Sequence, residues 1–336
     1  MILLSVSTAS LIFFTEFGGN AKHGWGAPET WMFGAALLVA GTLFVLVENK
    51  AQDPIIPLAF FKNRVFVIAT AIGFVLGIAM FAALAFVPTF LQMASGASAA
   101  ASGLLLLPMM VGLIGMSIIS GQVITRTSRY KMFPILGTVL VGVAMFLMTT
   151  LTADTPIWLI CVFLFVFGAG LGSIMQVVVL VVQNSVPPKD VGTATSTNNY
   201  FREVGSALGV AVFGAIFTSR LTDKLTDVFT QSGASASDAA SSTSSLDPAA
   251  LNKLPTAIHD LVVAAYADSL APVFWYLIPL IAIAFVLSLF LKNIPLSDVS
   301  GMVARGEAIS GEEAERAEAE LRAQASGKAT SAAPRD

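Results

Sequence analysis

The sequence predicts an all-α integral membrane protein with eight transmembrane helices. Two features of its composition support this fold class, because 56% of the 336 residues are hydrophobic and only 12% are charged. A soluble domain has roughly 25% charged residues, about twice as many. The third observation is that the apolar residues fall into blocks of about 20, the length that a helix needs to cross a hydrocarbon core about 30 Å thick.

The apolar blocks are separated by segments that favour turns or lie outside lipid. A glycine-rich stretch (18–29) ends in a Pro-Glu-Thr helix start, and the charged segment 49–64 contains two prolines. ASGASAAA (94–101) is small and polar, and the turns at 153–156 and 186–190 contain prolines, which cannot continue the preceding helix. We therefore expect helices at residues 2–17, 30–48, 65–93, 103–124, 132–152, 156–184, 193–217 and 269–291.

Two further segments have no transmembrane pattern. Residues 231–247 are low-complexity serine and alanine, which cannot bury enough apolar surface to offset the entropy lost on ordering. We expect a disordered external loop over about 219–267. The segment 293–336 is rich in alanine, glutamate and arginine, and we expect it to form a solvated cytoplasmic tail.

Lysine and arginine are unevenly distributed between the two sets of short loops. One set contains only Lys22, whereas the other contains Lys50, Lys62, Arg64, Arg126, Arg129, Lys131 and Lys189. Cytoplasmic loops carry an excess of these residues, so the second set is expected to face the cytoplasm. Both chain termini then lie in the cytoplasm, and the protein is expected to be a multi-pass protein of the cell (plasma or inner) membrane.

The first apolar block begins directly after Met1, with no basic segment before it and no small-residue cleavage site. This pattern argues against a signal peptide. The first helix begins so abruptly that we expect the chain to correspond to the later part of a longer protein.

Several classes of function are disfavoured. The net charge of −3 provides no basic surface for nucleic acid. The single cysteine, Cys161, lies in an apolar block, so neither an intrachain disulfide nor a metal-ligand spacing is available. The sequence contains no P-loop, GxSxG or HExxH motif. We therefore expect neither an enzyme, nor a cofactor or metal, nor a nucleic-acid partner.

The loop GQVITRTSRYK (121–131) carries a cluster of basic residues. Any cytoplasmic loop would be basic, so topology alone can explain the cluster. The segment also resembles the second-half copy of the Gly-x-x-x-Asp-Arg-x-Gly-Arg-Arg/Lys loop of the major facilitator superfamily. The matching positions are Gly121, Arg126, Arg129 and Lys131. Thr125 stands where the family usually has aspartate, and Ser128 where it usually has glycine.

Two longer stretches resemble the fourteen-helix drug:proton antiporter branch of that superfamily. Residues 47–66 are similar to the connection before its ninth helix, and residues 182–217 to its thirteenth helix. FVPTFLQ (86–92) and LLLLPMMVG (104–112) are similar to its ninth and tenth helices. The resemblance implies two central linker helices (1–48), a cytoplasmic connector (49–64), a C-terminal six-helix bundle (65–292) and a tail (293–336).

The same resemblance implies a function. It implies proton-coupled export of lipophilic, drug-like compounds by alternating access, with the small-molecule substrate, H⁺ and the lipid bilayer as partners. In such folds two bundles move about a site near the midplane. This chain would supply one of them and would need a separate N-terminal-half polypeptide or self-association. The alternative is a truncated or accessory membrane subunit without independent transport activity.

Polar residues within the predicted spans are the candidates for a substrate or coupling cavity. They are Arg202, Glu203, Asn198, Asn199 and Gln176. On the predicted helix 193–217, Asn198 and Arg202 share a face with two glycines, Gly205 and Gly209, at spacings of 4, 3 and 4. Arg202 lies ~14 Å into this span at 1.5 Å per residue, where a charge costs at least ~2.5 kcal/mol. It either lines a cavity or forms a structural pair with Glu203 or with helix-end carbonyls, and the residues leave both open.

The predicted helix 156–184 has two further features, a pair of glutamines and a set of glycines. Gln176 and Gln183 lie seven residues apart on one face, where they either line a substrate path or join helices by hydrogen bonds. Gly168, Gly170 and Gly172 are expected to permit close approach of neighbouring helices, as small residues do in membranes.

Overall fold

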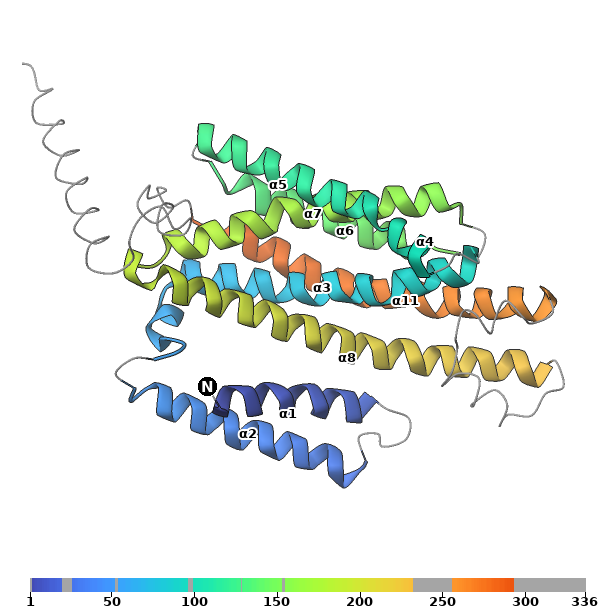
Figure 1. The fold of residues 1–336 in the computed structure, drawn as a ribbon, viewed down its shortest axis with the longest axis horizontal. Coiled ribbons are helices and arrows are strands. Elements are labelled where there is room, and N and C mark those ends of the chain that lie inside the picture. Colours follow the sequence, from blue (N-terminus) through green and yellow to red (C-terminus); the bar gives the residue numbers. More distant parts are fainter. Residues whose placement is uncertain are drawn as a thin grey trace, which may run out of the picture.

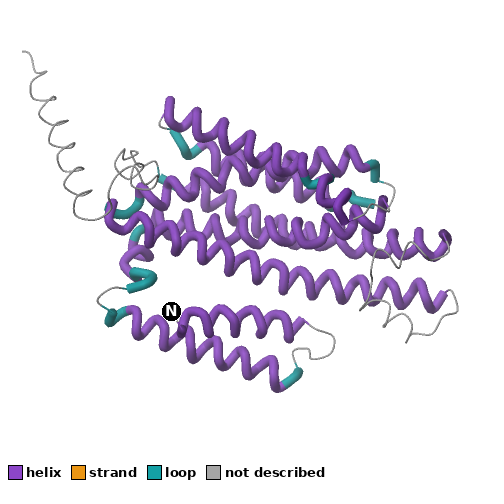
Figure 2. Tube along the Cα trace, viewed as in Figure 1, coloured by secondary structure: helices purple, strands orange, loops and turns teal. Residues whose placement is uncertain are grey.

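The computed structural model describes residues 2–19, 26–51, 54–95, 99–127, 129–152, 155–231 and 256–292. Every regular element in this part of the chain is a helix (Figure 2). The α-helices are α1 (Ile2–Gly19), α2 (Pro28–Glu48), α3 (Arg64–Ser95), α4 (Ala99–Leu104), α5 (Leu107–Thr127), α6 (Met132–Met148), α7 (Ile157–Asn184), α8 (Val191–Gln231) and α11 (Thr256–Phe290), with short 3₁₀ turns at Leu58–Lys62 and Pro188–Asp190. The predicted all-α class is confirmed.

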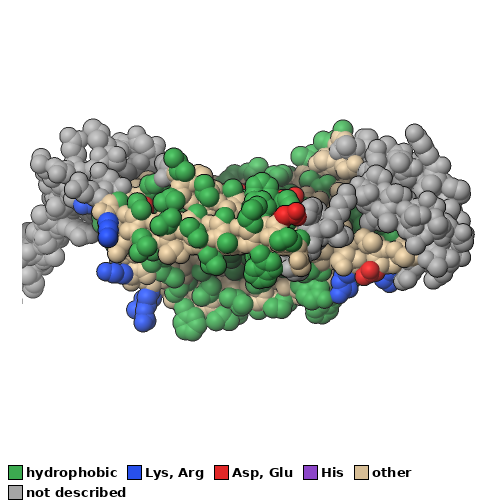
Figure 3. Space-filling view, turned by 90° about the horizontal axis from the view of Figure 1, so that it is seen from below, with side chains coloured by type: hydrophobic (Ala, Val, Ile, Leu, Met, Phe, Trp, Pro, Cys, Tyr) green, Lys and Arg blue, Asp and Glu red, His purple; other side chains and the backbone are tan. Residues whose placement is uncertain are grey.

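Within the described residues, six helical segments are long and apolar enough to cross a membrane. They are Pro28–Glu48, Arg64–Gln92, Ala100–Thr127, Ile157–Asn184, Pro188–Thr226 and Leu261–Phe290. Two shorter apolar helices, Ile2–Gly18 and Met132–Met148, accompany them. The protein is therefore a multi-pass membrane protein, whereas eight spans stay a prediction. In Figure 3 hydrophobic side chains cover the middle of one face, and lysines and arginines lie towards its ends.

The helices pack side by side along the long axis of the molecule (Figure 1). Helix α7 packs against α5 and α6, and α3 packs against α8, α11 and α7. Helix α11 also contacts α6 and α8. The α1–α2 hairpin contacts this bundle through α1, which lies against α8. The hydroxyls of Thr8 and Tyr200 are 2.6 Å apart at this contact. The hairpin is thus an appendage on the α8 side of the bundle.

Helices α8 and α11 extend beyond their predicted boundaries. Helix α8 continues to Gln231 rather than ending at 217, and α11 begins at Thr256 rather than at 269. The expected disordered loop over 219–267 is therefore wrong at both ends, and its remaining residues, 232–255, lie outside the described part of the chain. In α8 the physical reason is a stripe of buried Phe217, Leu221 and Leu225 at helical spacing, which continues an amphipathic helix beyond the apolar block. The added turns of α11 likewise bury Val262, Val263 and Tyr266.

The predicted helix 103–124 is divided into α4 and α5, with a break at residues 105–106. Pro108, in the first turn of α5, has no N–H to donate to the preceding turn, so the break costs few hydrogen bonds. The predicted tail, residues 293–336, lies outside the described residues.

Small residues set how closely the helices approach. A Cβ atom at Gly168 or Gly172 of α7 would collide with the carbonyl oxygens of Met109 and Leu113 on α5. At Gly170 a Cβ would lie 2.8 Å from the backbone nitrogen of Val141 on α6. The close approach expected at these three glycines is confirmed, because backbone atoms occupy the space that side chains would fill.

Candidate functional site

Helices α3 and α8 meet along two pairs of glycines with four-residue spacing. Gly73 and Gly77 belong to α3, and Gly205 and Gly209 belong to α8. A Cβ at Gly77 would collide with the carbonyl oxygen of Arg202, and one at Gly209 would lie 2.8 Å from the Cα of Ile78. Glycines at this spacing let membrane helices come into backbone contact. We name the contact defined by these four glycines the α3–α8 seam.

Asn198 is buried at the seam. Its side chain is only 3% exposed, and its Oδ1 lies 3.1 Å from the position of a Cβ on Gly73. The missing side chain of Gly73 therefore leaves the space that the amide occupies. Any larger residue at position 73 would compete with Asn198 for that space, so the glycine and the amide depend on each other.

Arg202 and Glu203 form an ion pair next to the seam. Arg202 Nη2 donates a hydrogen bond to Glu203 Oε1 at 3.2 Å. The side chain of Arg202 is 23% exposed and that of Glu203 is 57% exposed. Arg202 Nε is buried and has no hydrogen-bond partner. The pair therefore has a covered cationic end with an unused donor and an open anionic end.

The remaining candidates are less closely associated with this pair. Asn199 is half-buried, one residue along α8 from Asn198. Gln176 is exposed on α7, and within the described part of the chain no hydrogen bond joins it to the other four candidates. Gln183 donates to Thr195 Oγ1 at 3.3 Å, so Gln183 joins α7 to the first turns of α8.

Sequence analysis did not identify the α3 side of the seam. The stretch GFVLG (73–77) has the four-residue glycine spacing within an apolar block, which is a recognisable signal for close helix packing. Thr70, one turn before Gly73, is 5% exposed, and its Oγ1 has no hydrogen-bond partner. No sequence signal indicates that this hydroxyl is buried, because burial depends on the neighbouring helices.

The basic loop between α5 and α6 lies at one end of the bundle. Arg126 and Arg129 are exposed, and Lys131 directly precedes α6. Gly121 has open space around it, because a Cβ there would meet nothing within 4 Å. Tyr130 is fully buried, and its hydroxyl donates to the carbonyl oxygen of Lys292 at 2.6 Å. The tyrosine thus attaches the loop to the residues just after α11, while the arginines remain accessible.

The fold and the seam together define a multi-pass membrane protein with a charged pair within a transmembrane helix. Residues 2–210 match the Major Facilitator Superfamily. The chain belongs to this family of membrane transporters.

The relatives include drug-efflux proteins. The chain is 40% identical over 301 residues to an uncharacterized MFS-type transporter of Mycobacterium tuberculosis, covering 89% of this chain and 42% of that protein. It is 33% identical over 314 residues to the multidrug transporter protein MdtP of Bacillus subtilis, covering 87% of this chain and 58% of MdtP. The chain thus spans about half the length of these relatives.

The chain is also similar in fold to solved transporter structures. One of them is a bacterial homolog of the human lysosomal transporter Spinster in an inward-facing, unoccupied conformation. The TM-score is 0.52 at 15% identity, and the match covers 87% of this chain and 70% of that one. The likeness concerns the fold alone.

Proposed function

We propose that the chain supplies the C-terminal part of a proton-coupled exporter of lipophilic, drug-like compounds that works by alternating access. Its efflux relatives support the substrate class, and its match to about half of their length supports the role of one part of a larger transporter. In this proposal the chain contributes eight transmembrane helices, of which α1 and α2 are the linker pair. Both termini lie in the cytoplasm.

The observation that carries the proposal is the Arg202–Glu203 pair. A charge within a membrane span costs at least ~2.5 kcal/mol, and such residues normally face a cavity or a partner. Glu203 satisfies one nitrogen of Arg202, but the glutamate side chain is 57% exposed and Arg202 Nε has no partner. A purely structural pair would be enclosed and fully hydrogen-bonded. This pair instead has an open carboxylate that further groups can reach.

The two side chains divide the chemistry between them. Arginine stays protonated in proteins, whereas a carboxylate can take up a proton. We propose that the Glu203 carboxylate binds three partners in turn. They are Arg202, a proton, and a cationic or polar group of the substrate. Asn198, Asn199 and Gln176 are assigned to the cavity lining as hydrogen-bonding groups. Protonation of Glu203 would break the ion pair and leave the Arg202 guanidinium to attract another acceptor.

The test is transport by the chain with and without a second bundle. Everted membrane vesicles would contain the chain alone, or together with the N-terminal half of the M. tuberculosis relative, and would be assayed for ethidium uptake driven by a proton gradient. We expect gradient-dependent uptake that an uncoupler abolishes in at least one of the two preparations. Correctly inserted protein without uptake in either would overturn the proposal and favour an accessory subunit.

A further inference from the structure

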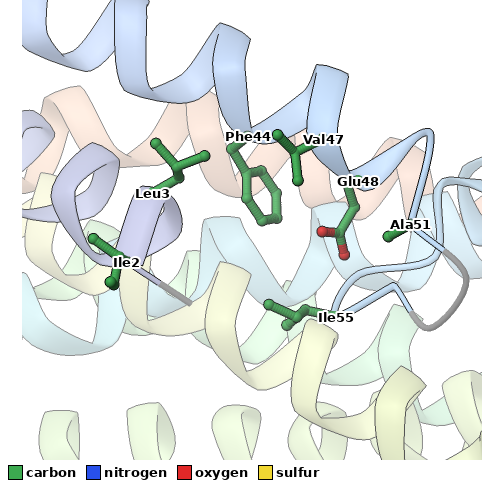
Figure 4. A pocket seen from close by; sticks show the side chains of 7 residues that line it. All are labelled: Ile2, Leu3, Phe44, Val47, Glu48, Ala51 and Ile55. Atoms are coloured by element: carbon green, nitrogen blue, oxygen red, sulfur yellow. The ribbon is translucent and has the colours of Figure 1, made fainter.

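An open-sided cavity of about 410 Å³ lies away from the seam, between the α1–α2 hairpin and the connector that follows it. Its lining is Ile2, Leu3, Phe44, Val47, Glu48, Ala51 and Ile55. Figure 4 shows Phe44 and Glu48 projecting from α2 into this space, with Leu3 on the far side and Ile55 below. Ligand sites typically have volumes of about 300–1,000 Å³ and mostly apolar walls with a few polar groups. The cavity has both properties.

Among the described residues of this lining, Glu48 is the single ionisable one. Its side chain is 6% exposed, and its Oε1 accepts a hydrogen bond from the backbone N–H of Ile56. An ionised carboxylate can accept about four hydrogen bonds, so capacity remains. No lysine or arginine among the described residues forms an ion pair with it.

A buried carboxylate without a cationic partner is costly, and a bound cation would relieve that cost. The apolar walls match a hydrophobic body, and the carboxylate at one end matches an ammonium group. The phosphate of any phospholipid would bring a second negative charge next to Glu48, even where the headgroup also carries an ammonium. Charge and shape together therefore select a lipophilic amine in its protonated form.

We propose that the cavity between α1, α2 and the connector binds lipophilic ammonium compounds, with Glu48 as the counter-ion. The site is independent of the proposed export function, because binding here requires neither Arg202 nor a second bundle. The body of the ligand lies against Leu3, Phe44 and Ile55, and its ammonium group donates to the free acceptor positions of Glu48.

The experiment uses the full chain in phosphatidylcholine nanodiscs, with empty discs as the blank. The probe is monodansylcadaverine, a fluorescent alkylammonium, and its N-acetylated form is the uncharged counterpart. We expect the charged probe to bind at least tenfold more tightly than the acetylated one. In Glu48→Gln this difference should disappear, because the amide still accepts from the Ile56 N–H but has no charge.

Two further variants separate charge from shape. Leu3→Trp fills the cavity and should weaken binding of both probes, whereas Glu29→Gln, at the exposed other end of α2, should change neither. Unfolding temperatures of all variants verify that they are folded. Unchanged binding of the charged probe in Glu48→Gln would overturn the proposal. A phospholipid bound in the cavity would also overturn it. Native mass spectrometry would then detect a lipid on the wild type that is absent from Leu3→Trp and that the probe does not displace.

Discussion

The carbonyl oxygen of Arg202 on α8 lies where the side chain of residue 77 on α3 would begin. Gly77 therefore determines how deeply α8 sits against α3, and with it how far the Arg202 side chain is covered. Ser206 reinforces the arrangement, because its Oγ donates to the same carbonyl oxygen at 2.9 Å. The position of the charged pair thus depends on a residue that has no side chain.

The first prediction concerns this contact. Gly77→Val should lower the free energy of unfolding by about 1–3 kcal/mol, because helices α3 and α8 must move apart to accommodate the added carbons. The measurement is the thermal unfolding midpoint of the purified chain. Gly115→Ala on α5 is the matched control, since a Cβ there meets nothing within 4 Å, and it should leave the midpoint unchanged or raise it. Equal midpoints for Gly77→Val and wild type would show that the seam is not tightly packed.

The second prediction distinguishes a transport role of Arg202 from a structural one. If Arg202 serves the cavity, Arg202→Ala should abolish proton-driven efflux while inserted protein stays close to wild type. If it is structural, removing it would leave Glu203 or nearby helix-end carbonyls without their partner inside the span, and yield would fall as well. The measurement is efflux per inserted molecule in the reconstituted two-bundle transporter. Normal efflux per molecule in Arg202→Ala would end the cavity assignment.

The third prediction refines the chemistry of the pair. Arg202→Lys keeps the charge but not the planar set of donors, so efflux retained with lysine would mean that charge alone matters. Glu203→Gln should leave substrate binding measurable but make efflux insensitive to the proton gradient, because the amide cannot take up a proton. Both variants are compared at several external pH values. Gradient-driven efflux by Glu203→Gln at the wild-type rate would exclude Glu203 as the proton carrier.

The fourth prediction concerns orientation in the membrane. In a Cys161→Ser background, Ser219→Cys should react with a membrane-impermeant maleimide on intact cells, whereas Thr127→Cys should react only after permeabilisation. Both positions are exposed, and Ser219 lies about 42 Å along α8 from its start at 1.5 Å per residue, beyond a hydrocarbon core about 30 Å thick. The reverse labelling pattern would place the basic loop outside.

The fifth prediction concerns the attachment of the basic loop. Tyr130→Phe removes the hydrogen bond to the Lys292 carbonyl and should lower stability by about 0.5–1.5 kcal/mol. Tyr276→Phe is the control, because its hydroxyl accepts from Arg220 at an exposed position and its loss should have a smaller effect. The measurement is the thermal unfolding midpoint of each variant, compared with that of the wild type. Similar midpoints would mean that the buried tyrosine contributes through packing alone.

The sequence by itself determined the membrane class, the helical content and most helix starts. These are local properties. An apolar block of about 20 residues indicates a membrane span, and a proline or glycine between blocks indicates a turn. The same locality explains the errors at the end of α8 and the start of α11. The added turns of α8 bury Leu221 and Leu225, and those of α11 bury Val262, Val263 and Tyr266. A search for apolar blocks cannot detect them.

Only the tertiary structure decided which polar groups are covered and which remain open. The spacing of Asn198 and Arg202 predicted a shared face, but the burial of Asn198 depends on Gly73 and the coverage of Arg202 on Gly77, both more than 100 residues away along the chain. From the sequence, Glu48 is only the last residue of a predicted helix. In the structure, the backbone N–H of Ile56 in the connector donates a hydrogen bond to its carboxylate. Burial is a property of packed neighbours, and those neighbours are brought together only when the chain folds.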